Sequence, residues 1–316
     1  MVGKVTPNDM MSCSRLPALL GFSKFRTPND ELKYTMNAIN NIENEFVEQE
    51  PMIWGNLTEK LILAEACKRL GVEIDVLDHE KPYFHADIPL ATSLDGTALG
   101  NDTVIYTDIS KGIYVMGQDS IKLDSFGILE AKLTAQEAEE NPALYRGVIQ
   151  LQGQIDIMKA NWGALCVLYK GTQLRIFLYA RNEDQINMIH NAVTDFQERV
   201  DKYKANDEIE WYPLSDSFEA ARVFDRAEKA EVDIPEVEIQ AEKIIALREK
   251  IAEAEDSIDE IQRGIMEQMR DYEVCKAGRY KISWPMRSYK AQPAKTVPAK
   301  EAYVIRQSKL SIKDRI

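Results

Sequence analysis

Gly127-Ile128-Leu129-Glu130-Ala131-Lys132-Leu133 is the stretch on which the expected fold depends. Apolar and polar residues alternate in it and predict a short strand, with Leu129, Ala131 and Leu133 on one face and Glu130 and Lys132 on the other. A second carboxylate, Asp95, lies upstream in a sequence typical of a tight turn, Thr92-Ser93-Leu94-Asp95-Gly96. Two carboxylates can bind a hard cation through oxygen, and an adjacent ammonium can orient the attacking water and help to deprotonate it. The pattern therefore indicates a metal-dependent phosphodiesterase site.

The Glu-x-Lys triplet also has a simpler interpretation as a solvated strand face. Charged residues make up 29% of the chain, so such triplets recur by chance. Here, however, the pair interrupts an apolar strand, and isolated charges are costly to bury unless they are paired or bind a metal. This stretch alone leaves both interpretations open.

Composition restricts the class of protein. The chain of 316 residues is long enough for one large domain or two smaller ones. No apolar run approaches the length of a membrane span, and residues 1–10 lack the apolar core of a signal peptide, so we expect a cytoplasmic protein. The four cysteines form no Cys-x-x-Cys pair, which argues against zinc and iron–sulfur sites.

The net charge of −13 is unevenly distributed along the chain. Residues 275–316 contain eleven Lys/Arg against two Asp/Glu, a net of +9, which leaves −22 for the remainder. Aromatic residues are interleaved with these cations, a composition that suits stacking on bases and contact with phosphates. We expect this tail to hold DNA; the alternative is that it docks on an acidic part of its own or a neighbouring subunit.

Residues 11–27 predict a helix that ends at Gly21, with Ser12 and Ser14 as candidate N-caps. Ser14 and Arg15 at its start would form a phosphate site, because free N–H groups and the helix dipole favour an anion there. A capped surface helix without a ligand is the simpler alternative.

The pattern downstream predicts alternating helices and strands. In the helix over residues 56–70, Leu57, Leu61 and Ala64 form the expected apolar stripe, and Glu59 lies off it. The helix over 142–159 begins with Asn141 as its cap and Pro142 at its first position. Further helices are expected over 28–49 and 183–204, and strands over 72–76, 90–93, 104–107, 113–116, 126–133, 164–169 and 173–179.

Three glutamines lie on the expected helix over 142–159. Gln150 and Gln154 are one turn apart and share a face, whereas Gln152 points roughly opposite. An amide that faces a core needs hydrogen-bond partners, so at least one of the three is expected to serve a site.

The order of elements predicts a mixed α/β (α+β) domain over residues 1–205. A linker over 206–235 separates it from a long amphipathic helix over 236–272, which is expected to be an arm or an oligomer contact. Residues 273–316 are expected to form a β-hairpin and the basic tail.

Five motifs occur in the order and approximate spacing of a known family. They are the opening Ser14-Arg15 with Gly21-Phe22-Ser23, Trp54-Gly55-Asn56-x-x-Glu59, Ser93-Leu94-Asp95-Gly96, Gly127-x-x-Glu130-Ala131-Lys132 and Gln150-Leu151-Gln152-Gly153-Gln154. Over residues 10–205 the chain resembles the YqaJ-like viral recombinases, relatives of phage lambda exonuclease in the PD-(D/E)xK nuclease superfamily. The resemblance implies a restriction-endonuclease-like core with a central mixed sheet flanked by helices. The stretch between Asp95 and Glu130 is longer than in compact members, which suggests an extra hairpin.

The resemblance also implies a role for each matching residue. Asp95 and Glu130 would bind metal together with the Ala131 carbonyl, Glu59 would complete the acidic cluster, and Lys132 would position and activate water. Gln152 would orient the nucleophile or the phosphate. The implied DNA contacts are Ser14, Arg15 and Ser93 near the 5′ phosphate, and Gln150 and Gln154. The family places an arginine a few residues before Ser14, where this chain offers only Lys4, and Arg15 is taken as its substitute.

The activity implied by the resemblance is that of a Mg²⁺-dependent 5′→3′ exonuclease acting on ends of double-stranded DNA in phage-type recombination. The resemblance also implies two Mg²⁺ per site, with Mn²⁺ as a substitute. It further implies a ring-like homo-oligomer of three or four subunits and a single-strand annealing partner. It also places the protein in the cytoplasm of a bacterial host, as a phage or prophage product. Two alternatives stay open: a PD-(D/E)xK endonuclease or other repair nuclease, and a non-catalytic DNA- or protein-binding recombination factor.

Overall fold

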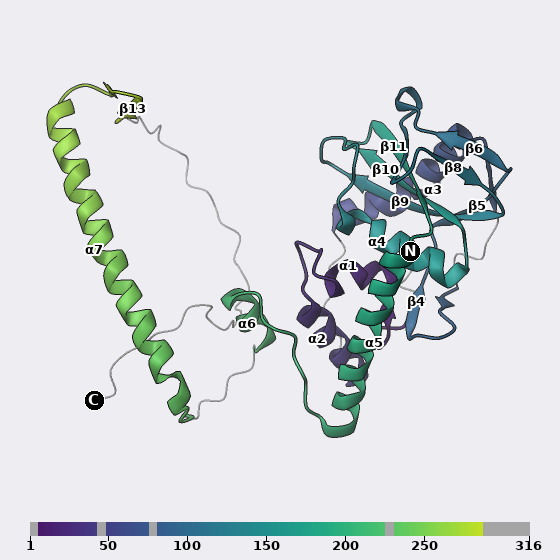
Figure 1. Cartoon of the computed structure of the whole chain (residues 1–316), viewed down its shortest axis with the longest axis horizontal. Helices are drawn as coiled ribbons and strands as arrows, with labels where there is room; N and C mark the ends of the chain where they lie inside the picture. The colour runs from purple at the N-terminus through teal and green to yellow at the C-terminus, as the bar shows by residue number, and fades with distance from the viewer. Residues whose placement is uncertain (1–5, 43–48, 76–80, 225–230, 287–316) are drawn as a thin grey trace. The chain divides into compact units, whose positions relative to one another are not determined.

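The computed structural model describes residues 6–42, 49–75, 81–224 and 231–286 (Figure 1). The chain divides into two compact units, Met1–Glu219 and Ala220–Ile316, which are described separately. Among the described residues, no helix is both long and apolar enough to cross a membrane.

A six-stranded mixed sheet forms the centre of the first unit. Its strand order is β2-β5-β9-β10-β11-β7, in which β9 and β10 are parallel, as are β11 and β7, and the other pairs are antiparallel. This arrangement confirms the predicted mixed α/β fold. The strands are β2 (Glu73–Asp75), β5 (Gly96–Leu99), β7 (Ile113–Val115), β9 (Phe126–Thr134), β10 (Trp162–Tyr169) and β11 (Gln173–Ala180).

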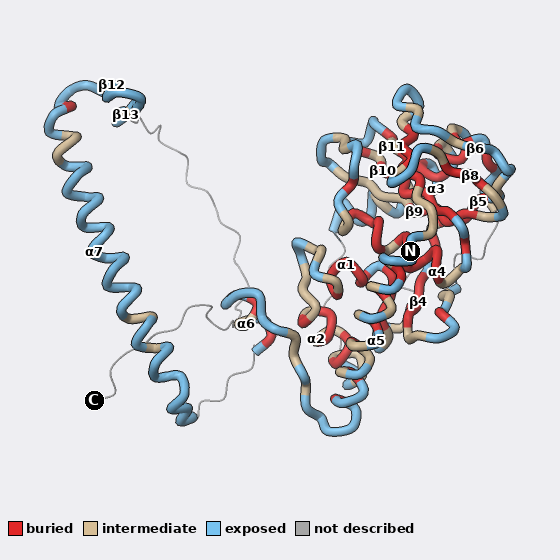
Figure 2. The backbone as a smooth tube through the Cα atoms, in the orientation of Figure 1, coloured by how far each residue is buried: buried red, intermediate tan, exposed pale blue. Residues whose placement is uncertain are grey.

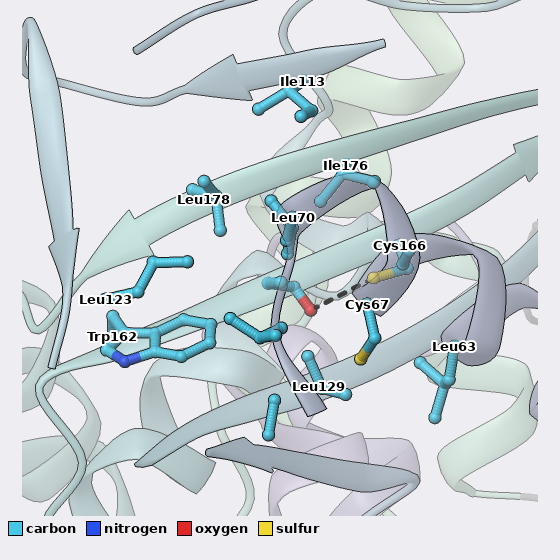
Figure 3. Close-up of a cluster of buried hydrophobic side chains, with 14 of the residues drawn as sticks. Leu63, Cys67, Leu70, Ile113, Leu123, Leu129, Trp162, Cys166, Ile176 and Leu178 are labelled. Atoms are coloured by element: carbon cyan, nitrogen blue, oxygen red, sulfur yellow. Dashed lines mark hydrogen bonds between the residues drawn. The ribbon is translucent and has the colours of Figure 1, made fainter. Parts of the chain in front are cut away.

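Helix α3 (Glu50–Leu70) covers one face of this sheet. Leu63, Cys67 and Leu70 of the helix pack against Leu129 of β9 and Cys166 of β10, within a large apolar cluster (Figure 3). Burial of this apolar surface is the main favourable contribution that attaches the helix to the sheet.

The predicted apolar stripe of α3 is wrong. Leu57 and Leu61 are 63% and 71% exposed, and Ala64 is exposed as well. The buried residues are Ile62, Leu63, Ala66, Cys67 and Leu70. Both sets repeat with helical spacing, and the spacing cannot tell which of two apolar faces meets the sheet. The helix also begins at Glu50, before the predicted start at residue 56.

Helix α4 (Val148–Met158) covers the opposite face of the sheet. Leu151 and Ile155 of α4 pack with Ile128 of β9 and Leu165 of β10. The outer side of α4 in turn contributes Ile149 to a cluster with α1 (Leu16–Leu19), α2 (Pro28–Ile39) and α5 (Glu183–Asn206). The buried residues therefore form layers on both sides of the sheet (Figure 2).

Two smaller sheets complete the first unit. β1 (Met11–Ser12), β4 (Leu90–Thr92) and β3 (Tyr83–Phe84) form a three-stranded sheet, in which β1 and β4 are parallel. In the stretch of sequence between Asp95 and Glu130, β6 (Thr103–Tyr106) pairs with β8 (Ser120–Leu123). The suggested extra hairpin is thus an antiparallel pair whose connection contains β7 and the short 3₁₀ helix η2 (Ile109–Lys111).

Two expected helix starts differ from the structure. A 3₁₀ turn, η1 (Cys13–Arg15), precedes α1, and neither Ser12 nor Ser14 caps it through its side chain. Gly147, with a φ of 124°, separates the short η3 (Leu144–Arg146) from α4, so the predicted helix over 142–159 begins only at Val148. This φ lies in the region that favours glycine and interrupts the helix.

Residues beyond the predicted boundary at 205 still belong to the first unit, because Ile209, Trp211 and Tyr212 pack against the α2–α5 cluster. Helix α6 (Ser217–Val223) spans the division between the units. The second unit contains η4 (Pro235–Val237), the long helix α7 (Glu238–Met269) and the hairpin β12 (Val274–Ala277) and β13 (Tyr280–Ser283), as predicted for residues 236–284. Most of the basic tail, residues 287–316, lies outside the described residues.

Candidate active site

Glu130 lies at the centre of a polar cluster on the α4 side of the sheet, and only 1% of its surface is exposed. Its Oε1 accepts hydrogen bonds from Lys132 Nζ and, at 2.7 Å, from Gln150 Nε2. Its Oε2 accepts from Gln154 Nε2 at 2.7 Å. A buried carboxylate is stable only when it is paired and hydrogen-bonded, and these three donors satisfy that requirement. The alternative of a solvated strand face does not fit this burial.

Lys132 supplies the positive charge of the cluster. Its ammonium contacts Glu130 and lies 3.2 Å from Gln150 Oε1. Burial lowers the pKa of Lys132, but the Glu130 and Asp95 carboxylates outweigh this effect and raise the pKa above its usual value. Lys132 is therefore an ammonium in this state of the site.

Asp95 lies in the turn between β4 and β5, and its Oδ2 accepts a hydrogen bond from the Ala131 backbone N–H at 2.8 Å. Burial and the nearby Glu130 carboxylate raise the pKa of Asp95 well above its usual range, against the opposing effect of Lys132. The negative charge of Glu59 on α3 also contributes to this rise. The carboxylates of Glu130 and Glu59 thus lie close enough to Asp95 to influence its pKa.

This donor set fits a hard divalent cation. Asp95, Glu130 and Glu59 offer carboxylate oxygens, and the hydrogen-bond donors on Asp95 and Glu130 are a backbone N–H, an ammonium and two amides. In a β-strand the N–H and C=O of one residue point to the same side, so the Ala131 carbonyl faces the Asp95 side of β9. The buried Gln154 Oε1 has no hydrogen-bond partner, and the crowded negative charges raise the pKa of Asp95. Both features are what a site short of a cation and its water shell would show.

Gly147 is a site residue that the sequence motifs did not indicate. A β-carbon at this position would lie 2.8 Å from Leu165 Cδ1 and 3.2 Å from Lys132 Cε. The glycine therefore allows the start of α4 to approach the Lys132 side chain closely. Gly147 directly precedes the apolar pair Val148-Ile149, and this pattern could have indicated that a helix starts there.

Gly147→Ala is expected to lower both stability and activity. The substitution places a side chain at a φ of 124° and pushes on Leu165 and Lys132, at a cost of about 1–3 kcal/mol for the backbone alone. Thermal unfolding and the hydrolysis rate would measure the two effects. Gly117→Ala is the matched control, since Gly117 also has a positive φ but has nothing within 4 Å of the added atom. Equal loss of activity in both variants would contradict the contact with Lys132.

The three glutamines of α4 divide in a way that corrects the sequence prediction. Gln150 and Gln154 both bind Glu130. Gln152 instead donates to the Ala180 carbonyl at 2.9 Å and accepts from the Asn182 N–H at 3.0 Å. It joins α4 to the end of β11, and its amide is fully used there. Gln150 and Gln154 are therefore better placed than Gln152 to serve the site, and both hold the Glu130 carboxylate by hydrogen bonds.

Of the three residues expected near the 5′ phosphate, two are exposed and one is buried. Ser14 and Ser93 are exposed. Each lies two residues after a member of the parallel pair Ser12 and Ala91, so β1 and β4 bring the segments that contain them side by side. Gln154 Nε2 lies 3.3 Å from the Ser93 carbonyl and links this pair of segments to Glu130. Arg15 is buried instead, with its guanidinium on Glu31 and Thr35, so that it stabilises α2 and is not directed to a ligand.

A second polar cluster lies elsewhere in the unit and was not predicted. His85, Asp156 and His190 bring their ligand atoms within 4.8 Å of one another, as in some metal sites. Nδ1 of His85 accepts from the backbone N–H groups of Asp87 and Ile88, so its Nε2 carries the proton of the neutral ring. Arg181 also binds Asp156 at 2.6 Å. A protonated Nε2 and a bound guanidinium both disfavour a cation, and the cluster acts as a clamp between α4, α5 and β3.

The fold and the site together define a mixed α/β protein in which Glu130 and Lys132 of β9 meet Asp95 of the turn before β5. No family model and no curated protein matches the sequence. Among solved structures, the chain is similar to an alkaline exonuclease from Laribacter hongkongensis, with 14% identity and a TM-score of 0.46, over 64% of this chain and 95% of that one.

A phage-related exonuclease from Haemophilus somnus 129PT is similar over 63% of this chain and 96% of that one, with 12% identity and a TM-score of 0.45. The Laribacter enzyme in complex with dAMP gives a TM-score of 0.44 at 14% identity, over 62% of this chain and 90% of that one. These proteins are exonucleases, the kind to which the sequence motifs pointed. The function of this chain is inferred from its own site.

Proposed function

We propose that the protein is a metal-dependent deoxyribonuclease that digests ends of double-stranded DNA from 5′ to 3′ and leaves 3′ single strands. The observation that carries this proposal is the convergence of Asp95, from the turn before β5, with Glu130 and Lys132 of β9, together with the hydrogen bonds by which Gln150 and Gln154 fix Glu130. A spent site would not need two amides, one of them buried, dedicated to one carboxylate. This observation favours an enzyme over the non-catalytic alternative.

The chain's own groups have distinct tasks in such a reaction. Asp95, Glu130, Glu59 and the Ala131 carbonyl would hold Mg²⁺, two ions in the proposal, which supplies charge stabilisation for the attacking and leaving oxygens when bound. Gln150 and Gln154 keep Glu130 in one orientation, so that no reorganisation is needed when charge develops. Lys132 places its ammonium beside Glu130, where it orients water and opposes the negative charge of a phosphate.

A groove on the α3 side of the sheet, near the end of β9, is the path that we propose for the DNA strand. β5 pairs with β9 only as far as Leu129, and beyond this point α3 and the turn after β10 border the edge of β9. The groove, of about 710 Å³, is lined by Trp54, Thr58, Leu133 and Lys170 among others. Trp54 is exposed, and aromatic faces stack on bases with little sequence preference.

Removal of divalent metal is expected to stop the reaction. The acidic cluster offers a hard cation oxygen ligands alone, so EDTA should abolish release of nucleotides from labelled linear duplex, and Mg²⁺ or Mn²⁺ should restore it. Nicked and circular duplexes in the same assay distinguish an exonuclease from an endonuclease, because only the latter cuts a closed circle. Full hydrolysis in EDTA would overturn the metal site.

We also expect digestion to prefer an end that carries a 5′ phosphate. The exposed hydroxyls of Ser14 and Ser93 follow adjacent parallel strands and lie next to the residues that fix Glu130. Hydrogen bonds to a charged group contribute about 1.5–3 kcal/mol each, which corresponds to a preference of roughly tenfold or more. Rates on phosphorylated and hydroxyl ends of one duplex measure it. Ser14→Ala should reduce the preference, and equal rates for both ends would refute the assignment.

The remaining parts of the proposal concern the setting of the enzyme. The 3′ strands would pass to a single-strand annealing protein, and the basic tail would hold DNA outside the site. The nuclease would act as a homo-oligomer in the cytoplasm of a bacterial host, as part of phage-type recombination.

A further inference from the structure

Helix α7 carries an apolar seam that the described residues leave uncovered. Leu247, Ile251, Ile258 and Ile261 are each more than half exposed, and Figure 2 shows the middle of the helix exposed. An amphipathic helix whose apolar side contacts water gains stability by covering that side. With 32 residues, α7 is about 48 Å long.

The seam repeats every seven residues. Val237, Ile244, Ile251, Ile258 and Ile265 occupy one position of the heptad, and every one of them is β-branched. Leu247, Ala254 and Ile261 occupy the second apolar position, with Gln240 and Gln268 at the ends. Such a repeat packs against another helix with the same repeat, knobs into holes, and this favours a second copy of α7 over a flat or irregular partner surface.

The charges of α7 select an antiparallel direction. Residues 238–250 contain three acidic and three basic side chains, whereas residues 251–269 contain six acidic side chains and one basic side chain. Opposite directions place the more basic half of one helix against the acidic half of the other. We infer that α7 pairs with α7 of a second copy of this chain as an antiparallel coiled coil.

The register follows from the seam. Centring the pair between Ala252 and Glu253 stacks Ile244 on Ile261, Leu247 on Ile258 and Ile251 on Ala254 of the second copy, each pair occurring twice by symmetry. Beside the seam, Arg248 then meets Glu255 of the second copy at both ends of the contact. Large and small residues alternate at the centre, as close packing requires.

A parallel pair would be poorer. It would place Lys250 near Glu255 of the second copy, but also Lys243 near Arg248, so that one attraction is offset by one repulsion in each half. The antiparallel pair has the Arg248–Glu255 attraction and no repulsion between charged flanking residues. Because the contact is two-fold symmetric, it predicts an even number of chains in the assembly, which favours four subunits over three.

The first experiment measures the mass of the full-length protein in solution, without DNA, by light scattering and sedimentation. Ile251→Asp/Ile258→Asp places charges in the seam and should halve the mass. Ala246→Asp/Ala252→Asp adds the same two charges to the outer side of the same helix and should leave the mass unchanged. A mass that the seam variant does not alter, or a wild-type protein that is monomeric at all concentrations, would overturn the inference.

The second experiment fixes the direction through charge reversal. In the antiparallel pair, Arg248→Glu sets Glu against Glu255 and should weaken association by about tenfold, and Arg248→Glu/Glu255→Arg should restore it. In a parallel pair, Arg248→Glu would turn the Lys243 repulsion into an attraction and strengthen association. Sedimentation equilibrium of the two variants separates these outcomes, and stronger association of Arg248→Glu would refute the antiparallel arrangement. Neither experiment depends on the proposed nuclease activity.

Discussion

Glu130→Gln is expected to abolish DNA hydrolysis while the protein stays folded. The substitution keeps the size of the side chain and an oxygen that Lys132 and the two glutamines can contact, but it removes the buried negative charge. A preorganised charged group at a reacting centre contributes at least about 10²–10³-fold to the rate, and a carboxylate that also holds the metal should exceed this range. Nucleotide release from labelled linear duplex measures the loss.

The design of this variant follows from the surroundings of Glu130. Glu130→Ala would leave the Lys132 ammonium, the buried Gln154 amide and the Gln150 amide without their acceptor, and a loss of folding would then imitate a loss of chemistry. Glu137→Gln is the matched control, because Glu137 lies just beyond β9, is largely exposed and pairs only with Lys170 among the contacts described. Unchanged hydrolysis in Glu130→Gln, with a normal unfolding temperature, would exclude the site.

The course of the chain was predictable where local pattern decides it. The strands β9, β10 and β11 and the helix α5 begin and end within a few residues of their predicted bounds, because alternating apolar residues and clear turns enclose them. The sheet order was not predictable, since the neighbours of β7 and β2 depend on contacts distant in sequence. The prediction of which face of α3 is buried was wrong for a related reason. The helix has one apolar side at Leu57 and Leu61, which is exposed, and another at Ile62 and Leu63, which is buried.

The candidate site was predictable where the function needs a charge on a strand. Strand alternation alone places Glu130 and Lys132 on the same face of β9, and the structure brings Asp95 of the preceding turn and Glu59 of α3 close enough to affect the pKa of this group of residues. The partners of uncharged groups were less predictable. Gln152 and Gln154 differ by two positions on one helix, yet one binds backbone at the end of β11 and the other binds Glu130. Arg15 was expected on the surface, but Glu31 on α2 takes its guanidinium into the interior.

Lys132→Ala is expected to lower kcat by about 10²–10³-fold, the range for removal of one preorganised electrostatic group at a reacting centre, with little change in the Kd for duplex DNA. The ammonium lies against Glu130 and Gln150, within the cluster and not along the outer surface that a duplex would cover. A phosphate contact would show the opposite result, a weaker Kd with a normal kcat. Lys122→Ala is the control, because Lys122 is exposed on β8 and pairs with Asp102.

The protonation state of Lys132 makes a further variant informative. The neighbouring carboxylates raise the pKa of this ammonium, so around neutral pH it retains its proton and acts as a cation that orients water. Lys132→Arg keeps the charge but replaces a compact ammonium with a broad planar fork, which cannot occupy the same position between Glu130 and Gln150. We therefore expect Lys132→Arg to recover duplex binding fully but only a small part of kcat. If Lys132→Arg restores the whole rate, the residue supplies charge alone, and the position of its ammonium does not matter for the chemistry.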